Sequence, residues 1–389
     1  MKLIEVNSPA TIRLFHKVSA ILNHDDPQWV PYIHNDIEKI FDVEHYKIFK
    51  EGGKAIRWVI EDEKGNPLGR IAAFINPRVM DTTNFKTGGI GFFESVNDQK
   101  VANFMFDTCR NWLKNNGMEA MDGPINFGDR NQFWGCQISN FDEPPIYQMN
   151  YSRPYHRELF EAYGFGVYFN QYMYWRDVSI PAQEIFHRKY NQMKDQPGFR
   201  FRDIKGMHID MVADHFATVY NGAWGGHSHF KPMTQEAARK IFRSMKKIID
   251  PEIVIFLYHD DVPVAFYVNL PELNQVFRYM DGTMGIIDKI KFLYYTKIKR
   301  VTTRMTGIAF GVIKEWQGKG LEAAMIVYGE KTIGKRAQYK DTVLTWIGDF
   351  NPKMMKVASN LGATIWRSFI TYRYQFDRTR PFERAKNVE

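Results

Sequence analysis

The sequence has few of the features that mark secreted, membrane-spanning or disulfide-rich chains. Only two of its 389 residues are cysteines, Cys109 and Cys136, which excludes a disulfide framework and predicts two buried thiols. No apolar run approaches the ~18 residues that a membrane-spanning helix needs. Residues 1–15 contain Glu5 and lack the continuous apolar core of a signal peptide. We therefore expect a cytoplasmic protein without a membrane span.

Composition and charge restrict the class of protein and of partner. A hydrophobic content of 44% and a charged content of 25% are typical of a globular protein, and 389 residues suit two domains. The formal net charge of +8 suits an anionic partner such as a nucleotide-containing cofactor, a carrier protein, nucleic acid or an acidic membrane. The positive residues are mostly dispersed, with denser runs at 289–304 and in the last twelve residues.

The stretch from Arg304 to Arg336 predicts a buried strand, a glycine turn and a helix. Residues 306–313 are small, apolar and β-prone, and the turn Gln317-Gly318-Lys319-Gly320 follows. Apolar residues then recur at helical spacing to about Arg336. Such a turn directs unpaired backbone N–H groups at an anion, and glycines leave room for a phosphate.

The rest of the chain predicts two copies of one plan, joined by a connecting segment. Each copy begins with a strand and two helices, continues with a strand hairpin, and ends in strand, helix, strand, helix and strand. We place the copies at 1–178 and 199–377, the connecting segment at 179–198 and a basic tail at 378–389. The closing strands are expected at 165–175 and 363–376.

The residues of this plan resemble the GNAT (Gcn5-related N-acetyltransferase) superfamily. Gln317 and Gly320 match the first and fourth positions of its Gln/Arg-x-x-Gly-x-Gly/Ala loop, although Glu322 stands at the sixth. The first copy has Ser95 to Asp98 where this loop is expected. Four further segments are similar to bacterial tandem-GNAT proteins of the YghO type: residues 91–95, 149–165, 270–275 and 311–321. The resemblance implies a mixed α/β (α+β) fold of two tandem GNAT-like domains, each with a central twisted sheet flanked by helices.

The resemblance also implies acyl-CoA as cosubstrate and no metal. The positions that it assigns to the cofactor are Ile308, Ala309, Phe310, Gly311, Val312, Gln317, Gly318, Lys319, Gly320, Leu321 and Asn351. Backbone N–H groups at a bulge in strand 308–312 would hold the thioester oxygen, as an oxyanion hole does.

The superfamily's usual acid, a tyrosine, is replaced by Ala358 in this sequence. Asp349 and the pair His227 and His229 are candidate bases, and Tyr328 is a candidate acid. Each has a structural alternative: a helix cap for Asp349, a surface turn for the histidines and a core position for Tyr328.

The sequence therefore predicts an N-acyltransferase that moves an acetyl or longer acyl group to the amine of a small or lipid-like acceptor. An acyl carrier protein is an alternative donor. A catalytically degenerate GNAT binding protein is one alternative function, and a Fem-like transferase that uses aminoacyl-tRNA is another, less favoured one. Residues 285–304 mix lysines with aromatics, which fits either peripheral membrane contact or a helix packed on the sheet.

Overall fold

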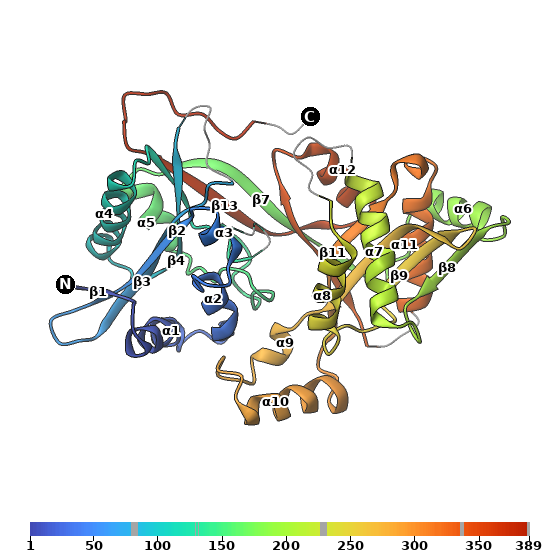
Figure 1. Ribbon diagram of the computed structural model, residues 1–389, viewed down its shortest axis with the longest axis horizontal. Coiled ribbons are helices and arrows are strands. Elements are labelled where there is room, and N and C mark those ends of the chain that lie inside the picture. Colours follow the sequence, from blue (N-terminus) through green and yellow to red (C-terminus); the bar gives the residue numbers. More distant parts are fainter. Residues whose placement is uncertain (79–84, 129, 131, 226–231, 335–337, 387–389) are drawn as a thin grey trace.

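The computed structural model describes residues 1–78, 85–128, 130, 132–225, 232–334 and 338–386. Its strands form one continuous 13-stranded sheet in the order β1-β2-β3-β4-β5-β13-β7-β12-β11-β10-β9-β8, with β6 beside β13. Figure 1 shows this sheet running through both predicted halves, with helices on its two faces. The predicted mixed α/β architecture is confirmed. Among the described residues, no helix is both long and apolar enough to cross a membrane.

The amino-terminal half of the sheet lies between two layers of helices. Ser8 and Asp98 begin helices α1 and α4, because their side chains accept the backbone N–H groups of Thr11 and Lys100. Helices α1 and α2 cover a core cluster around Phe15 on one face, and α4 and α5 cover a second cluster on the other. The elements are β1 (Lys2–Glu5), α1 (Pro9–Asn23), α2 (His34–Ile40), α3 (Lys47–Lys50), β2 (Lys54–Glu61), β3 (Pro67–Ile75), β4 (Thr87–Ser95), α4 (Gln99–Asn115), β5 (Ala120–Gly123), β6 (Cys136–Gln137), α5 (His156–Tyr163) and β7 (Gly166–Asp177).

The carboxy-terminal half repeats this arrangement. Helices α7 and α8 pack on one face of its strands, and α6 and α11 pack together on the other. The elements are α6 (Glu184–Met193), β8 (Phe199–Asp203), α7 (Ile209–Trp224), α8 (Gln235–Met245), β9 (Val254–His259), β10 (Val262–Pro271), α9 (Asn274–Phe277), α10 (Ile286–Leu293), the π-helical turn η1 (Tyr294–Ile298), β11 (Arg304–Val312), the 3-10 turn η2 (Lys314–Trp316), α11 (Leu321–Ile333), β12 (Asp341–Gly348), α12 (Pro352–Asn360) and β13 (Thr364–Gln375).

The closing strands of the two halves exchange places. Strand β7, expected to close the first half, pairs with β12, and β13, expected to close the second half, pairs with β5. The two strands also pair with each other, antiparallel, along most of their length. The two halves are thereby joined through backbone hydrogen bonds. The boundaries 1–178, 179–198, 199–377 and 378–389 stay a prediction, because the sheet continues across them.

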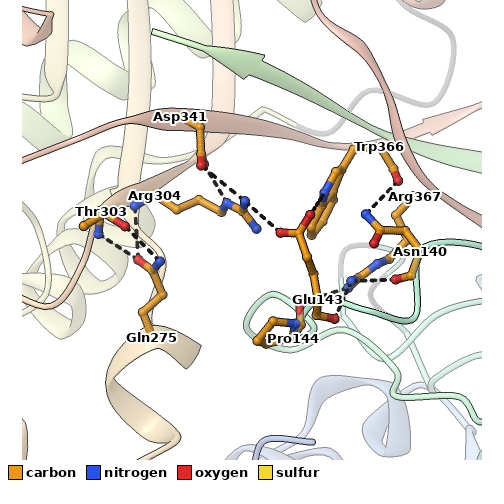
Figure 2. A network of polar contacts seen from close by, with 9 residues as sticks. All are labelled: Asn140, Glu143, Pro144, Gln275, Thr303, Arg304, Asp341, Trp366 and Arg367. Carbon is orange, nitrogen blue, oxygen red and sulfur yellow. Dashed lines mark hydrogen bonds and ion pairs between the residues drawn. The ribbon is translucent and has the colours of Figure 1, made fainter. Parts of the chain in front are cut away.

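A network of polar contacts fixes the join on one side of the sheet (Figure 2). Glu143, from a loop of the first half, accepts hydrogen bonds from Arg304 on β11 at 3.0 Å and from the Trp366 indole at 2.8 Å. Arg304 also pairs with Asp341 at 2.6 Å, where β11 and β12 begin to run in parallel. Through Glu143, the first half of the chain therefore holds the end at which β11 and β12 begin to pair.

Arg367 of β13 holds the same loop from the other side. Its guanidinium, which is fully buried, donates to the backbone carbonyls of Asn140, Glu143 and Pro144 at 3.0, 2.7 and 3.2 Å. Burial lowers the pKa of Arg367 to about 10, so the side chain stays charged at neutral pH.

Glu272, at the end of β10, is a buried carboxyl at the join. Its Oε1 accepts the backbone N–H groups of Tyr147 at 2.9 Å and Asn274 at 2.8 Å, and its Oε2 accepts the hydroxyl of Thr306 at 3.1 Å. Burial raises the pKa of Glu272 to about 7.

Replacing Arg367 by methionine should destabilise the protein, because three partly buried carbonyls lose the guanidinium and only that of Asn140 keeps another donor, the Gln137 amide. We expect a loss of about 3 kcal/mol in the free energy of unfolding, measured by urea denaturation. Arg13→Met, at an exposed position on α1, is the control and should change it by less than about 0.5 kcal/mol. Equal losses in both variants would contradict the role of Arg367.

Glu272→Gln should remove a pH dependence of stability. The folded-state pKa lies above the ordinary value of 4.5, so the folded protein keeps a proton that the unfolded chain releases. The wild type should therefore lose stability as pH rises from 5 to 8, by up to about 3 kcal/mol relative to the glutamine variant. Unfolding at several pH values measures this, and Glu63→Gln, at an exposed position, should follow the wild type at every pH.

Candidate active site

The candidate site lies where two parallel strands of the carboxy-terminal half separate. Strands β11 and β12 pair from Arg304 opposite Asp341 to Gly307 opposite Leu344, and then part. Directly after Gly307, Ile308 is an extra residue in β11, because Ala309 and Gly307 pair with consecutive residues of β10. Beyond this bulge the β11 edge that faces β12 has no strand partner among the described residues. Apart from the Val312 carbonyl, which accepts the Gln317 amide, its backbone polar groups are available to a ligand.

Strand β12 bends away at the same level. Thr345 and Trp346 are two residues opposite one residue of β7, and Trp346 has a φ of +62°. Such a bulge turns a strand away from its neighbour.

The parted strands open a cavity of about 500 Å³. Its walls come mostly from β11, β12 and α12, with single residues from β7, β10 and α11 and two from α7, and they are mostly apolar. Ile308 and Met354 keep 52% and 42% of their surface exposed, so the cavity presents large apolar side chains to its contents. The lining residues are Arg176, Tyr220, Trp224, Tyr267, Gly307, Ile308, Ala309, Phe310, Ile326, Thr342, Leu344, Thr345, Trp346, Ile347, Gly348, Phe350, Asn351, Met354, Val357, Ala358, Leu361 and Ala363.

The amino-terminal half has the same strand geometry, but its own chain fills the gap. Strands β4 and β5 pair from Thr87 to Gly89 of β4 and then part, and Phe92 forms a bulge with a φ of +49°. The N–H of Ile125 donates to the carbonyl of Ile90 at 2.7 Å, so the chain takes up the free strand edge. A Cβ atom at Gly91 would lie 1.6 Å from the Ile125 carbonyl oxygen.

The cavity that described residues line beside this gap has a volume of about 80 Å³. The first turn of α4 is capped by Asp98, whose negative charge disfavours an anion at that helix end.

The glycine turn of the carboxy-terminal half lies at the surface after β11. Gly320 is the N-cap of α11 with a φ of +89°, and no side chain in the described ranges caps this helix. The first backbone hydrogen bond of the helix runs from Ala324 to Gly320, which leaves the N–H groups of the first turn available. Gly318 has a φ of +73°, and a Cβ there would meet nothing within 4 Å.

Two lysines lie at this turn. The Cδ atom of Lys189, from α6, lies 2.9 Å from the point that a Cβ atom on Gly320 would occupy. The Lys319 ammonium lies 4.6 Å from the Trp316 ring. The Gln317 amide turns back and donates to the carbonyl of Val312 at 2.9 Å. Glu322, the departure from the superfamily pattern, is half-buried and has no hydrogen bond or ion pair to the described part of the chain.

Of the four residues that were predicted for catalysis, the structure describes two, Asp349 and Tyr328, and neither belongs to the lining of the cavity. Asp349 follows β12, and its Oδ2 is held by Asn170 at 2.9 Å and by Arg384 of the tail at 2.6 Å. Tyr328 is half-buried on α11 and stacks on Phe201, with ring centroids 5.2 Å apart, outside the lining of the cavity.

His227 and His229 lie outside the described residues. Ala358 lines the cavity at the position where the superfamily has its acid. The Asn351 side chain also reaches the lining, but its oxygen caps α12 by accepting the N–H of Met354 at 3.1 Å.

Three residues of the cavity that carry a phenol or a guanidinium group were not predicted from the sequence. Tyr267 of β10 lines it, in register with Phe310 of β11, and burial raises the pKa of its phenol. Tyr220 reaches it from α7, and Arg176 reaches it from β7. Nothing pointed to Arg176, because β7 reaches this half only through the strand exchange.

Comparisons with known proteins agree with this geometry. No protein-family model matches the sequence. The chain is 24% identical over 377 residues to the bacterial ceramide synthase of Caulobacter vibrioides, covering 96% of this chain and 97% of that protein. It is 22% identical over 370 residues to protein YghO of Escherichia coli strain K12, covering 94% and 93%.

Two solved structures have a similar fold. One is the tandem GNAT protein from the clavulanic acid biosynthesis pathway, with a TM-score of 0.53, 10% identity, and coverage of 98% of this chain and 99% of that one. The other contains the GCN5-related glucosamine N-acetyltransferase region of a fungal multi-domain β-N-acetylglucosaminidase, with a TM-score of 0.53 and 12% identity. This chain is covered to 96% there and spans 38% of that protein's chain. The protein therefore has the tandem GNAT fold and is a distant homologue of the bacterial ceramide synthase and of YghO.

Proposed function

We propose that the protein is an N-acyltransferase that moves an acyl group from acyl-CoA to the amine of a lipid-like acceptor. The observation that carries this proposal is the cavity of about 500 Å³ between the parted strands β11 and β12. It has a free strand edge with a bulge at Ile308 on one side and an uncapped helix end after Gly320 nearby. The filled gap of the amino-terminal half supports the carboxy-terminal half as the binding half.

In this proposal the free edge of β11 binds the pantetheine arm through backbone hydrogen bonds. The turn 317–320 binds the diphosphate through the first-turn N–H groups of α11, with Lys319 and Lys189 adding positive charge. Backbone N–H groups at the Ile308 bulge hold the carbonyl oxygen of the thioester, whose negative charge grows as the amine attacks.

The reaction then requires two proton movements. The amine nitrogen attacks the thioester carbon, the C–S bond breaks, and the products are an amide and CoA. A base takes the proton that the amine loses, and an acid protonates the leaving thiolate. Tyr267 is the acid in this proposal, because it lines the cavity and its raised pKa keeps the phenol protonated at neutral pH. Asp349 stays a candidate base.

Two observations support a lipid-like acceptor and a long acyl chain. The cavity walls are mostly aliphatic and aromatic, with exposed apolar side chains at Ile308, Met354 and Val357. The homologue that covers 96% of this chain is named a ceramide synthase, and a ceramide is the amide of a long-chain amino alcohol with a fatty acid.

A second candidate function is ligand binding without turnover, favoured by Ala358 at the expected acid position. It shares the binding step with the first proposal, so binding and turnover are tested separately.

Ile308→Trp should weaken the binding of a long-chain acyl-CoA by at least tenfold, because the larger ring fills the space beside the free strand edge. Isothermal titration should give one site per chain for the wild type. Ile365→Trp, on β13, is a matched control with 50% exposure against 52% for Ile308, and it should bind as the wild type does. Unchanged binding by Ile308→Trp, with the fold verified by its melting temperature, would remove the cavity as the CoA site.

Tyr267→Phe should lower kcat by about a hundredfold or more, since the thiolate would leave without its proton donor. The release of CoA, detected with a thiol reagent in the presence of a long-chain amino alcohol, measures this. KM should change little, because the ring remains. Tyr328→Phe is the matched control and should keep near-normal kcat; a loss in that variant instead would move the acid to Tyr328. Wild-type binding without any CoA release would favour the second candidate function.

A further inference from the structure

Helix α10 and the π-helical turn η1 present an apolar surface to solvent. Ile286, Ile287 and Ile290 are 79%, 70% and 62% exposed, and Leu293 and Ile298 are 54% and 71% exposed. Single exposed apolar residues are common, but five on one short helical segment form a patch that calls for a partner. Figure 1 shows α10 at the lower margin of the molecule, beneath α9 and away from the sheet.

The opposite side of the segment attaches it to the protein. Asp288 and Phe292 are its buried residues, at the i, i+4 spacing of one helix face. Phe292 stacks on Phe277 of α9 at 5.9 Å, and Tyr295 stacks on Tyr279 at 4.1 Å. The Asp288 carboxylate accepts the Thr283 hydroxyl at 3.2 Å. These contacts fix the orientation, so the apolar side faces outward in the folded protein.

Lysines flank the apolar side on both edges. At about 100° per residue, the four apolar residues Ile286, Ile287, Ile290 and Leu293 lie within roughly 120° of one another, opposite the buried pair. Lys289 falls just beyond one edge of this face and Lys291 just beyond the other, and both are exposed. This order, apolar in the centre and basic at the borders, is that of a helix lying in the interface of a bilayer.

The charge of the segment is strongly one-sided. Residues 286–300 contain five cations, Lys289, Lys291, Lys297, Lys299 and Arg300, against one acid, Asp288, which is turned inward. A basic border around an apolar face is complementary to a lipid surface that carries acidic headgroups, which attract the cations while the acyl region receives the aliphatic side chains.

We propose that α10 and η1 are a docking surface for an anionic phospholipid bilayer. The isoleucines and Leu293 enter the boundary between headgroups and acyl chains, and the flanking lysines contact the phosphates. The helix lies in the plane of the membrane and does not cross it. This proposal stands on its own geometry and does not depend on the acyl-transfer reaction.

Vesicle flotation without any substrate tests the proposal. The wild-type chain should bind vesicles of phosphatidylcholine with 30% phosphatidylglycerol at least tenfold more tightly than vesicles of phosphatidylcholine alone, and 0.5 M salt should weaken the binding. The double variant Ile287→Asp/Ile290→Asp should lose at least tenfold in binding to the acidic vesicles. Both positions are exposed, so the variant should keep the wild-type melting temperature.

Matched variants separate the surface from general effects of charge. Ile180→Asp/Ile185→Asp introduces the same charges at residues that are 58% and 42% exposed elsewhere, and it should bind vesicles with less than a threefold change. In Ile290→Trp, the indole emission should shift to the blue on acidic vesicles and be quenched by brominated lipid.

Three results would overturn the proposal. They are absence of wild-type binding to acidic vesicles, equal binding by the Ile287/Ile290 variant, and a dimer in light scattering that the same variant abolishes. The last result would assign the face to a second copy of the chain.

Discussion

The separation of β11 from β12 is the constraint on which the proposed site depends. Two bulges, at Ile308 and at Thr345–Trp346, end the parallel pairing after four residue pairs. A sheet normally satisfies its backbone groups by keeping its strands together, so an open edge inside a sheet is stable only if something else occupies it. In the amino-terminal half the chain itself does so, through Ile125. In the carboxy-terminal half an apolar cavity remains, and this difference is the basis of the proposal that only the second half binds a ligand.

The exchange of β7 and β13 makes the two halves one body. Because β7 pairs with β12, Arg176 of the first half lines the cavity of the second. The loop that contains Glu143 connects β11, β13 and the start of the parallel pair, and Arg367 holds its carbonyls (Figure 2). The opening between β11 and β12 therefore begins at a point that is fixed from both halves, which keeps the cavity walls in place.

Local patterns predicted much of this fold. The strand, glycine turn and helix at 304–336 were evident because a buried strand, two glycines and a helical apolar face follow one another directly. The exchange of closing strands was not evident, since β7 and β13 have similar patterns and either could pair with β5 or β12. Tyr267 and Arg176 could not be assigned to the cavity for the same reason: a sequence pattern shows which residues form a strand but not which strand lies beside it.

The segment 285–304 shows a second limit of prediction from the sequence. Its mixture of aliphatic, aromatic and basic residues fitted both a helix packed on the sheet and a membrane-facing helix. The choice between them depends on which face of α10 and η1 packs on the protein. Phe292 and Tyr295 stack on Phe277 and Tyr279, so the aromatic face is covered and the aliphatic face is exposed. Ala358 shows a third limit of the sequence analysis. The sequence shows that the usual tyrosine is missing at this position, but only the structure shows which other acidic side chains lie close to the cavity.

The central claim is that the carboxy-terminal half alone binds acyl-CoA, along the free edge of β11. Backbone hydrogen exchange, measured by mass spectrometry with and without a saturating long-chain acyl-CoA, tests it most directly. The account predicts slower exchange in peptides that cover 307–324 and no change in those that cover 88–102. Protection in the amino-terminal peptides, or no protection in either half, would contradict it.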